Sequence, residues 1–255
     1  MVNSTRCFEN EKRHTDYDGF AWFYDRYWAC RYHKVAIPAL EKLLLARLLP
    51  GSPVLDLCCG SGHLSRHLAG RGFIVTGLDG SEELLKYARA NVPAGRFLAG
   101  DARRFSMPGT FQAVLCTFDS LNHVLEREAL TAVFKNVRAA LRPGGEFLFD
   151  LNMEEAYRTM WGRMSAEVEP DNVCIVRGRY LAEERLGRTE ITTFRLVDGW
   201  RRADTVLHQR CYSPEEVLAS LDEAGFKDVL VYDARRDLQI ADDIGVGRMF
   251  FLAGR

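Results

Sequence analysis

The chain has 255 residues, of which 47% are hydrophobic, and its formal net charge at pH 7 is −1. This length and apolar content predict one α/β domain with an elaboration, in preference to two independent domains. A net charge near zero gives no electrostatic basis for binding nucleic acid or an anionic membrane, so neither is an expected partner. No apolar run approaches the roughly 18 to 20 residues that a membrane-spanning helix needs.

The cysteines and the first residues bear on redox state and location. Seven cysteines occur without a C-x-x-C pair, so no metal site is expected. The opening residues, Met1 to Arg6, lack the apolar core of a secretory signal, which predicts a cytoplasmic protein with reduced thiols. Residues 1 to 16 are polar and are expected to be frayed.

An aromatic segment follows, with seven aromatic residues between Tyr17 and Trp28. Helical spacing of most of them indicates core packing under an amphipathic helix. A second interpretation makes the segment a lid over a bound cation, because aromatic faces attract positive charge. In that interpretation Tyr17 and Tyr24 contact the ligand. A further helix is predicted from Ile37 to Leu49, ending at Pro50-Gly51.

From residue 53 onward, predicted strands and helices alternate. The apolar runs suit strands that are covered on both faces, which indicates a parallel sheet with crossover helices. The expected strands are 53–57, 73–78, 95–99, 111–116 and 145–151, and the expected helices are 63–70, 81–91 and 126–141.

The second part of the chain has a different pattern. Segments 173–180, 189–197 and 201–210 alternate in the manner of antiparallel strands, with Asp198-Gly199 as a turn. They predict a small sheet over one end of the main sheet. Ser213-Pro214 is a helix-opening pair, and the helix is expected to end at Glu223. Two strands, 226–232 and 248–253, follow, and the last is expected to be antiparallel.

The most informative motif is a glycine-rich turn after the strand 53–57. Gly60 and Gly62 allow backbone N–H groups to approach a ligand at the start of the next helix. Asp56, Asp79 and Asp101 come at the carboxyl ends of three successive predicted strands. The sequence therefore predicts three carboxylates in one crevice, although each could also be an ordinary turn or capping residue.

Two ligand classes compete for this crevice. A dinucleotide site favours G-x-G-x-x-G, but Ser65 replaces the third glycine, and Asp56 would lie near the pyrophosphate. S-adenosylmethionine has an ammonium and no phosphate, so it suits Asp56 better. Asp79 can accept hydrogen bonds from ribose hydroxyls, and Asp101 can accept one from the adenine amine. An NAD(P)-dependent oxidoreductase is the less favoured alternative.

Five motifs in chain order resemble those of class I S-adenosylmethionine-dependent methyltransferases of the small-molecule type. The family commonly has glycine at the place of Cys58, whereas a cysteine at the place of Cys59 is familiar in it. The resemblance covers roughly residues 35 to 152. The motifs are Asp56-Leu-Cys-Cys-Gly-Ser-Gly62, Gly77-Leu-Asp-Gly-Ser81, Gly100-Asp-Ala102, Phe111-Gln-Ala-Val-Leu-Cys116 and Leu141-Arg-Pro-Gly-Gly-Glu-Phe147.

The resemblance implies a fold and a cofactor site. The fold is a doubly wound, mostly parallel, seven-stranded Rossmann-like sheet with a small antiparallel lid sheet. The expected organisation is an aromatic helical lid (1–34), the cofactor-binding core (35–152), an antiparallel insertion (153–212) and a closing segment (213–255). By this resemblance Gly60 and Gly62 approach the methionine part, Asp56 supports its ammonium, Asp79 holds the ribose, and Asp101 and Ala102 border the adenine. The remaining cofactor candidates of the core are Cys58, Ser61, Gly80, Thr117 and Phe118.

Residues that could assist the chemistry follow the strand 111–116. His123 can act as a base near neutral pH, and Asp119 or Asn122 can orient the acceptor. His208 can reach the same pocket from the lid sheet. Each histidine could instead be a capping, packing or solvated residue.

The predicted function is methyl transfer from S-adenosylmethionine to nitrogen or oxygen of a small molecule, by in-line displacement in an enclosed pocket. A regulatory protein that binds the cofactor without turnover is the alternative from another class. The expected assembly is a monomer or a homodimer.

Overall fold

The computed structural model describes residues 16–255, so most of the expectation for residues 1 to 16 lies outside the described residues. The helices are α1 (Ala21–Phe23), α2 (Cys30–Leu43), α3 (His63–Gly70), α4 (Glu82–Asn91), α5 (Arg127–Ala140), α6 (Glu154–Met160) and α7 (Pro214–Glu223). The strands are β1 (Pro53–Leu57), β2 (Ile74–Asp79), β3 (Arg96–Ala99), β4 (Phe111–Cys116), β5 (Leu141–Asn152), β6 (Met164–Glu169), β7 (Asn172–Leu181), β8 (Leu186–Leu196), β9 (Trp200–Arg210), β10 (Val229–Asp233) and β11 (Arg248–Gly254).

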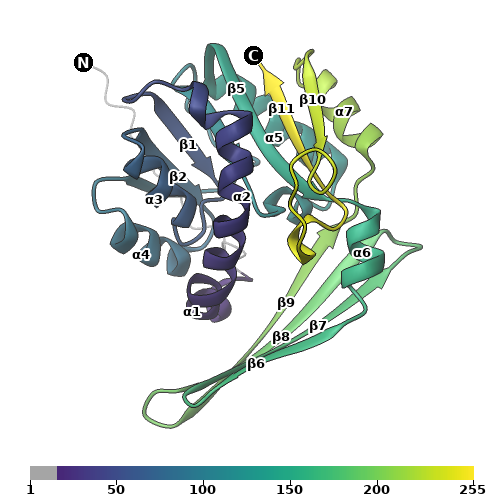
Figure 1. Cartoon of the computed structure of the whole chain (residues 1–255). Coiled ribbons are helices and arrows are strands. Elements are labelled where there is room, and N and C mark those ends of the chain that lie inside the picture. Colours follow the sequence, from purple (N-terminus) through teal and green to yellow (C-terminus); the bar gives the residue numbers. More distant parts are fainter. Residues whose placement is uncertain (1–15) are drawn as a thin grey trace.

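The main sheet has seven strands in the order β10-β11-β5-β4-β1-β2-β3 (Figure 1). β1 to β5 pair in parallel, and β11 is antiparallel to both β5 and β10. The strand order reverses between β1 and β4, where the carboxyl ends of neighbouring strands diverge and open a crevice. The predicted doubly wound sheet with an antiparallel last strand is confirmed.

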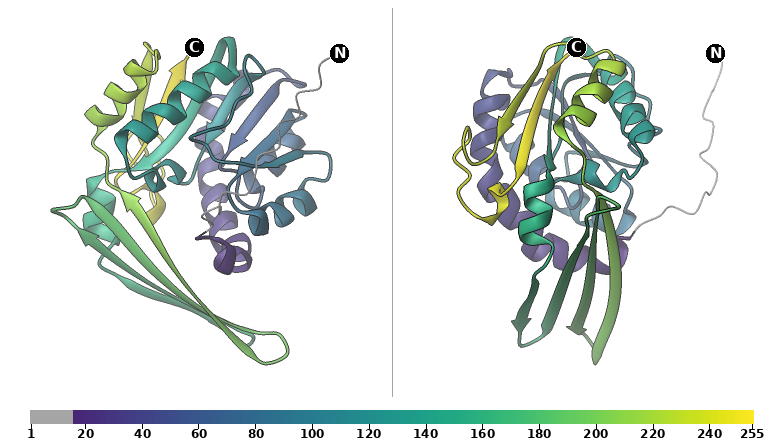
Figure 2. Two further views of the ribbon diagram at one scale, coloured as in Figure 1. Left: turned by 180° about the vertical axis from the view of Figure 1, so that it is seen from behind. Right: turned by 90° about the vertical axis from the view of Figure 1, so that its right-hand side faces the viewer.

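Helices cover both faces of this sheet, as the right-hand view of Figure 2 shows. One buried cluster joins α5 and α7 to β4, β5 and β11, and it contains the stacked rings of Phe147, Phe149 and Phe251. The other joins α2 and α3 to the opposite face through residues such as Leu40 and Leu68. The apolar strand runs arise from this coverage on both faces.

The second sheet, β6-β7-β8-β9, is antiparallel and extends away from the carboxyl end of the main sheet (Figures 1 and 2). β7, β8 and β9 confirm the three predicted strands. β6 and α6 were absent from the prediction, although Met164, Ala166 and Val168 alternate with polar residues in a strand-like pattern. All six residues of β6 are exposed, so β6 contributes an edge without core burial.

The aromatic segment is helical in three successive forms, a 3₁₀ turn at 18–20, α1, and a π-helix at 24–29, before it enters α2. The prediction that a helix begins at Ile37 was wrong, because α2 already begins at Cys30 and contains Pro38. Proline removes one backbone hydrogen bond inside a helix. Burial of Tyr32, Ala36 and Leu40 on one side of α2 outweighs this cost.

The start of α7 is as the sequence indicates. Ser213 accepts a hydrogen bond from Glu216 N–H, the Glu216 side chain accepts one from Ser213 N–H, and Pro214 is the first helical residue. Among residues 16–255, none of the helices combines the length and apolar character that crossing a bilayer requires.

Candidate functional site

A cavity of about 2130 Å³ lies between the carboxyl ends of the main-sheet strands, the aromatic segment and the inner face of the second sheet. Typical small-molecule sites occupy roughly 300–1,000 Å³. This cavity can therefore hold a nucleoside cofactor together with a second molecule.

The glycine-rich turn forms one wall of the cavity. Cys58 has a φ of +58°, the left-handed conformation that glycine adopts without a steric penalty. Glycine, which the resembled family commonly has at this place, would suit this conformation. A Cβ atom placed on Gly60 would lie 3.0 Å from the ring of Tyr24, so the aromatic segment packs directly on the turn.

Asp79 is the carboxylate best placed for a ribose. It lines the cavity at the end of β2, and it accepts hydrogen bonds from Gly60 N–H and Ser81 N–H, both at 2.8 Å. Burial raises the pKa of Asp79, against the lowering effect of these N–H donors. A carboxylate has about four acceptor sites, so lone pairs remain for two hydroxyls.

Asp56 and Asp101 differ from Asp79 in their surroundings. Asp56 is 2% exposed, and it accepts a hydrogen bond from Ser65 at 2.6 Å behind the cavity wall. Asp101 lines the cavity and forms a two-pronged ion pair with Arg103, which lowers the pKa of Asp101 although its partial burial acts in the opposite direction. The contacts that the resemblance implies for these two carboxylates stay predictions.

The burial of Asp56 has a measurable consequence for stability. Burial raises the pKa of Asp56 to about 7, from an unfolded value near 3.8. The folded form holds the Asp56 proton more tightly than the unfolded form does. The contribution of protonated Asp56 to stability is therefore complete below about pH 3.8 and is lost as pH rises to about 7. Between pH 5 and 7 this titration makes the free energy of unfolding fall by up to about 1.4 kcal/mol per pH unit. We expect Asp56→Asn to remove this pH dependence.

The measurement is urea unfolding of both proteins at several pH values. Burial lowers the pKa of His33 to about 4, so His33 makes stability rise with pH in an overlapping pH range. Only the difference between the curves of the two proteins isolates the contribution of Asp56. A pH-independent difference would contradict the shifted pKa of Asp56.

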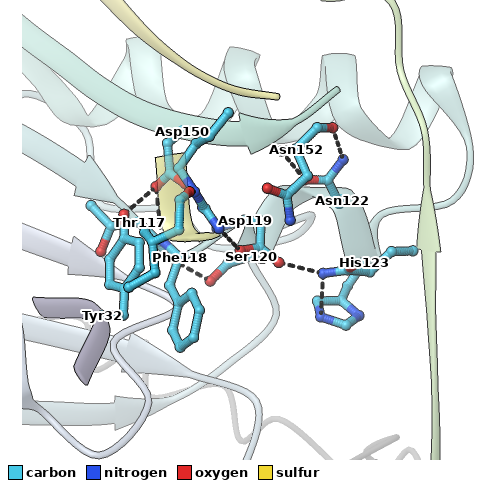
Figure 3. A network of polar contacts seen from close by, with 12 residues as sticks. Tyr32, Thr117, Phe118, Asp119, Ser120, Asn122, His123, Asp150 and Asn152 are labelled. Atoms are coloured by element: carbon cyan, nitrogen blue, oxygen red, sulfur yellow. Dashed lines mark hydrogen bonds and ion pairs between the residues drawn. The ribbon is translucent and has the colours of Figure 1, made fainter. Parts of the chain in front are cut away.

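The loop after β4 is held by a buried ionic network (Figure 3). Phe118 and Asp119 both have positive φ angles, +61° and +48°. Asp150 accepts hydrogen bonds from both their N–H groups, at 2.7 and 3.2 Å, and from the hydroxyl of Tyr32 at 2.9 Å. Arg248 then bridges the carboxylates of Asp150 and Asp119.

The charges of this network are fixed by its contacts. Burial raises the pKa of Asp150, but Arg248 opposes that effect and four donors favour the ionised form. Burial alone would lower the pKa of Arg248, yet the two carboxylates raise it above its ordinary value. Arg248 thus contacts two buried carboxyl groups beside the cavity.

His123 has a defined tautomer. Its Nδ1 lies 2.8 Å from the carbonyl oxygen of His208, an acceptor, so Nδ1 carries the proton. Its Nε2 faces only donors, the Tyr17 hydroxyl at 2.9 Å and the Gln209 amide nitrogen at 3.3 Å. Burial lowers the pKa of His123, partly offset by Asp119. The imidazole is therefore neutral near pH 7, and its Nε2 lone pair accepts the hydrogen bond from the Tyr17 hydroxyl.

The aromatic segment closes this end of the cavity. Tyr17 contacts His123 and Tyr24 edge-on, and Tyr24 stacks on Phe118 with ring centroids 6.0 Å apart. Two polar contacts also attach the segment to the cofactor side: Ser81 donates to Asp18 at 2.6 Å, and Asp25 pairs with His63 at 2.9 Å.

The structure brings most of the predicted site residues to one cavity. Those that line it are Tyr17, Tyr24, Cys58, Gly60, Asp79, Gly80, Asp101, Ala102, Phe118, Asp119, His123 and His208. Four cofactor candidates of the described chain, Asp56, Ser61, Gly62 and Thr117, lie behind the cavity wall. His208 contacts His123 through its main chain, so its role as a side-chain base gains no support from this contact.

Sequence reasoning missed three residues of the site: Tyr32, Gln209 and Arg248. Gln209 could have been found from the alternation of β9, in which Thr205, Leu207 and Gln209 are buried on one face. An arginine within the apolar strand β11 was a similar signal, because an arginine is rarely buried without a charged partner.

Comparison with known proteins agrees with this geometry. Residues 54–145 match the family model described as a methyltransferase domain. A putative methyltransferase, YqeM of Bacillus subtilis (strain 168), is 29% identical over 83% of this chain and 86% of that protein. A ubiquinone biosynthesis O-methyltransferase of Xanthomonas axonopodis pv. citri (strain 306) is 32% identical over 61% of this chain and 69% of that protein.

A solved structure with bound S-adenosylmethionine is also similar. CalS10, an amino pentose methyltransferase from Micromonospora echinaspora involved in calicheamicin biosynthesis, is 25% identical with a TM-score of 0.71. The match covers 91% of this chain and 96% of that chain.

The residues present fit this cofactor. The Asp79 carboxylate retains acceptor sites for a diol, the aromatic rings of Tyr24 and Phe118 line the cavity, and the cavity has room for a second molecule. The chain belongs to the class I S-adenosylmethionine-dependent methyltransferases, with S-adenosylmethionine as its cofactor.

Proposed function

We propose that this enzyme transfers a methyl group to the nitrogen of a small-molecule amine by in-line displacement within the enclosed cavity. The observation that carries the proposal is the neutral His123, which lines the cavity next to the loop after β4 and whose Nε2 accepts a hydrogen bond from the Tyr17 hydroxyl. An amine binds as its free base when a neutral imidazole accepts one of its hydrogens.

The electrostatics of the site favour an amine. Asp119 and Asp150 are balanced only by Arg248, and the rings of Tyr17 and Tyr24 border the same space. Such surroundings stabilise the positive charge that develops on a methylated nitrogen. A hydroxyl acceptor gains less from them.

A hydroxyl acceptor is the second candidate function. His123 could remove a hydroxyl proton as the carbon–oxygen bond forms. The similarity to a ubiquinone biosynthesis O-methyltransferase supports this alternative, as the similarity to an amino pentose methyltransferase supports the amine.

The protein groups divide the work as follows. When bound, S-adenosylmethionine supplies an electrophilic methyl group on a sulfonium, and its sulfur departs neutral. Asp79 binds and orients the nucleoside, and the aromatic segment excludes water. When the Tyr17 hydroxyl gives up its hydrogen bond to Nε2, His123 accepts one from the acceptor nitrogen instead and takes up the proton that this nitrogen loses after methylation. The carbonyl of His208 holds the imidazole in the tautomer that this step needs. Alignment of the acceptor nitrogen with the methyl group supplies most of the rate enhancement. Because the sulfur departs neutral, no oxyanion site is required.

The test is turnover with matched pairs of amines and alcohols. We expect methylated product from methyl 3-amino-3-deoxyglucopyranoside, benzylamine or cyclohexylamine in preference to the corresponding alcohols, measured by mass spectrometry with S-adenosylmethionine. His123→Asn should lower kcat about 10²-fold or more, the usual range for a general base, with an unchanged Kd for S-adenosylhomocysteine.

Two outcomes would contradict the proposal. One is preferential methylation of the alcohols, which would support the hydroxyl alternative. The other is the absence of any methylated amine from protein that binds S-adenosylhomocysteine.

The monomeric or homodimeric state and the four-part division of the chain stay predictions.

A further inference from the structure

Asn122 is fully buried, and both ends of its amide are bonded to main-chain groups (Figure 3). Its Nδ2 donates to the carbonyl oxygens of Asn152 at 3.1 Å and Arg210 at 2.8 Å, and its Oδ1 accepts from Asn152 N–H at 3.0 Å. Asn122 lies behind the cavity wall. It is therefore not placed to touch an acceptor molecule, although the sequence suggested that role.

These contacts join the two sheets. Asn152 is the last residue of β5 in the main sheet, and Arg210 is the last residue of β9 in the second sheet. β9 is an edge strand, so the main-chain groups along its free edge need partners from outside its sheet. One side chain thus fixes the ends of two strands that belong to different sheets.

The next residue of the chain is bonded to the same strand. His123 Nδ1 donates to the carbonyl oxygen of His208, two residues before Arg210 on β9. Consecutive residues of the loop after β4 therefore bond to alternate carbonyl groups of β9. The place of the His208 carbonyl relative to the imidazole depends on where β9 ends, and Asn122 fixes that end.

We propose that Asn122 is a positioning residue, which fixes β9 against β5 and so holds the His208 carbonyl where it keeps the His123 proton on Nδ1. The inference rests on the proposed function, in which His123 acts through Nε2. In a neutral imidazole, the hydrogen bond made by one nitrogen decides which nitrogen carries the proton. Asn122 therefore acts on the reaction through His123.

Loss of the amide should release this tautomer. Tyr157 also donates to Arg210 O, but at 3.4 Å it is the weaker anchor. Buried main-chain groups rarely remain unpaired, so the ends of β5 and β9 must shift to find new partners. The His208 carbonyl moves with β9, and His123 can then carry its proton on Nε2. In that tautomer Nε2 has no lone pair for an acceptor molecule.

The first test is ¹⁵N NMR of histidine-labelled protein, in which the signals absent from His123→Asn identify His123. In the wild type we expect the proton on Nδ1 alone. Asn122→Leu keeps a similar volume without an amide, and it should add a population with the proton on Nε2. The matched control is Gln112→Leu, because the Gln112 amide also donates to a main-chain carbonyl, that of Gly144, but away from the cavity. This control should keep the wild-type tautomer.

The second test is a double-mutant cycle on kcat with benzylamine and cyclohexylamine. Asn122→Leu alone should lower kcat about 10- to 100-fold, as expected for a displaced reacting group, with an unchanged Kd for S-adenosylhomocysteine. In the His123→Asn background it should lower kcat no further, because two residues that act as one unit are not additive. If Asn122→Leu does not fold, Asn122→Ser should give the same results, since a hydroxyl has one hydrogen and cannot bond to both carbonyls.

The possible failures are distinct. If the Asn122 variants keep the proton on Nδ1 alone, the inference is overturned, whether or not kcat falls. A further loss of kcat in the His123→Asn background would show that Asn122 supports the fold and not His123, and would overturn it as well. If wild-type protein methylates no amine, the proposed function fails, while the NMR comparison still decides whether Asn122 controls the tautomer.

Discussion

Replacing Arg248 with methionine should lower the free energy of unfolding by about 3–5 kcal/mol, the usual effect of removing one partner from a buried ionic network. Arg248 is 4% exposed and lies between the carboxylates of Asp119 and Asp150. Its Nε also donates to the carbonyl of Ile244 at 2.8 Å. Methionine fills a similar volume, so the loss arises mainly from two carboxylates left without a counter-charge.

The loss should depend on pH. Arg248 lowers the pKa of Asp150, so without Arg248 this pKa rises. Protonation of Asp150 then stabilises the fold at low pH, and this contribution disappears as pH rises. The stability deficit should therefore be smaller at pH 5 than at pH 8, in urea unfolding monitored by circular dichroism.

The matched control is Arg201→Met. Arg201 also forms an ion pair, with Asp198, but both side chains are 67% exposed, and such pairs contribute about 0–1 kcal/mol. Similar losses from the two substitutions would show that the buried network stabilises the fold no more than a surface pair does.

The parts of the fold that the sequence predicted are those with short-range signals. The turn at Gly60 and Gly62 follows directly from one strand, and Asp79 ends the next, so residue order alone places them at one sheet edge. The helix after Ser213 was found because its capping residues are adjacent in the chain.

The missed parts depend on long-range packing. The pairing of Arg248 with Asp150 exists because β11 inserts between β10 and β5, and nothing local to Arg248 identifies Asp150 as its partner. The helix was predicted to begin at Ile37, but α2 begins at Cys30, where burial of Tyr32 and Leu40 joins the earlier residues to the same helix. Strand alternation could have placed Gln209 on a buried face, but only the tertiary structure brings that face to Asp119 and His123.

Gly62→Ala is the second change with a large expected effect, a loss of about 2–5 kcal/mol in stability. Gly62 has a φ of +79°, where a side chain costs about 1–2 kcal/mol. An added Cβ would also lie 2.9 Å from the backbone Cα of Ala88 in α4, and such overpacking costs typically 1–3 kcal/mol. To relieve the contact, the first turn of α3 must move away from α4.

Gly51→Ala separates these two contributions. Gly51 has nearly the same φ, +82°, but nothing lies within 4 Å of a Cβ placed there, so only the conformational cost applies. We expect Gly62→Ala to be less stable than Gly51→Ala by about 1–3 kcal/mol. Affinity for S-adenosylhomocysteine, measured by calorimetry, should fall only in Gly62→Ala, since Gly62 N–H bonds to Cys59 O and so helps to shape the turn that holds Gly60. If Gly62→Ala and Gly51→Ala lost equal stability and kept equal affinity, the glycine-rich turn and α4 would not be in tight contact. The wall of the cavity that this turn forms would then not depend on that contact.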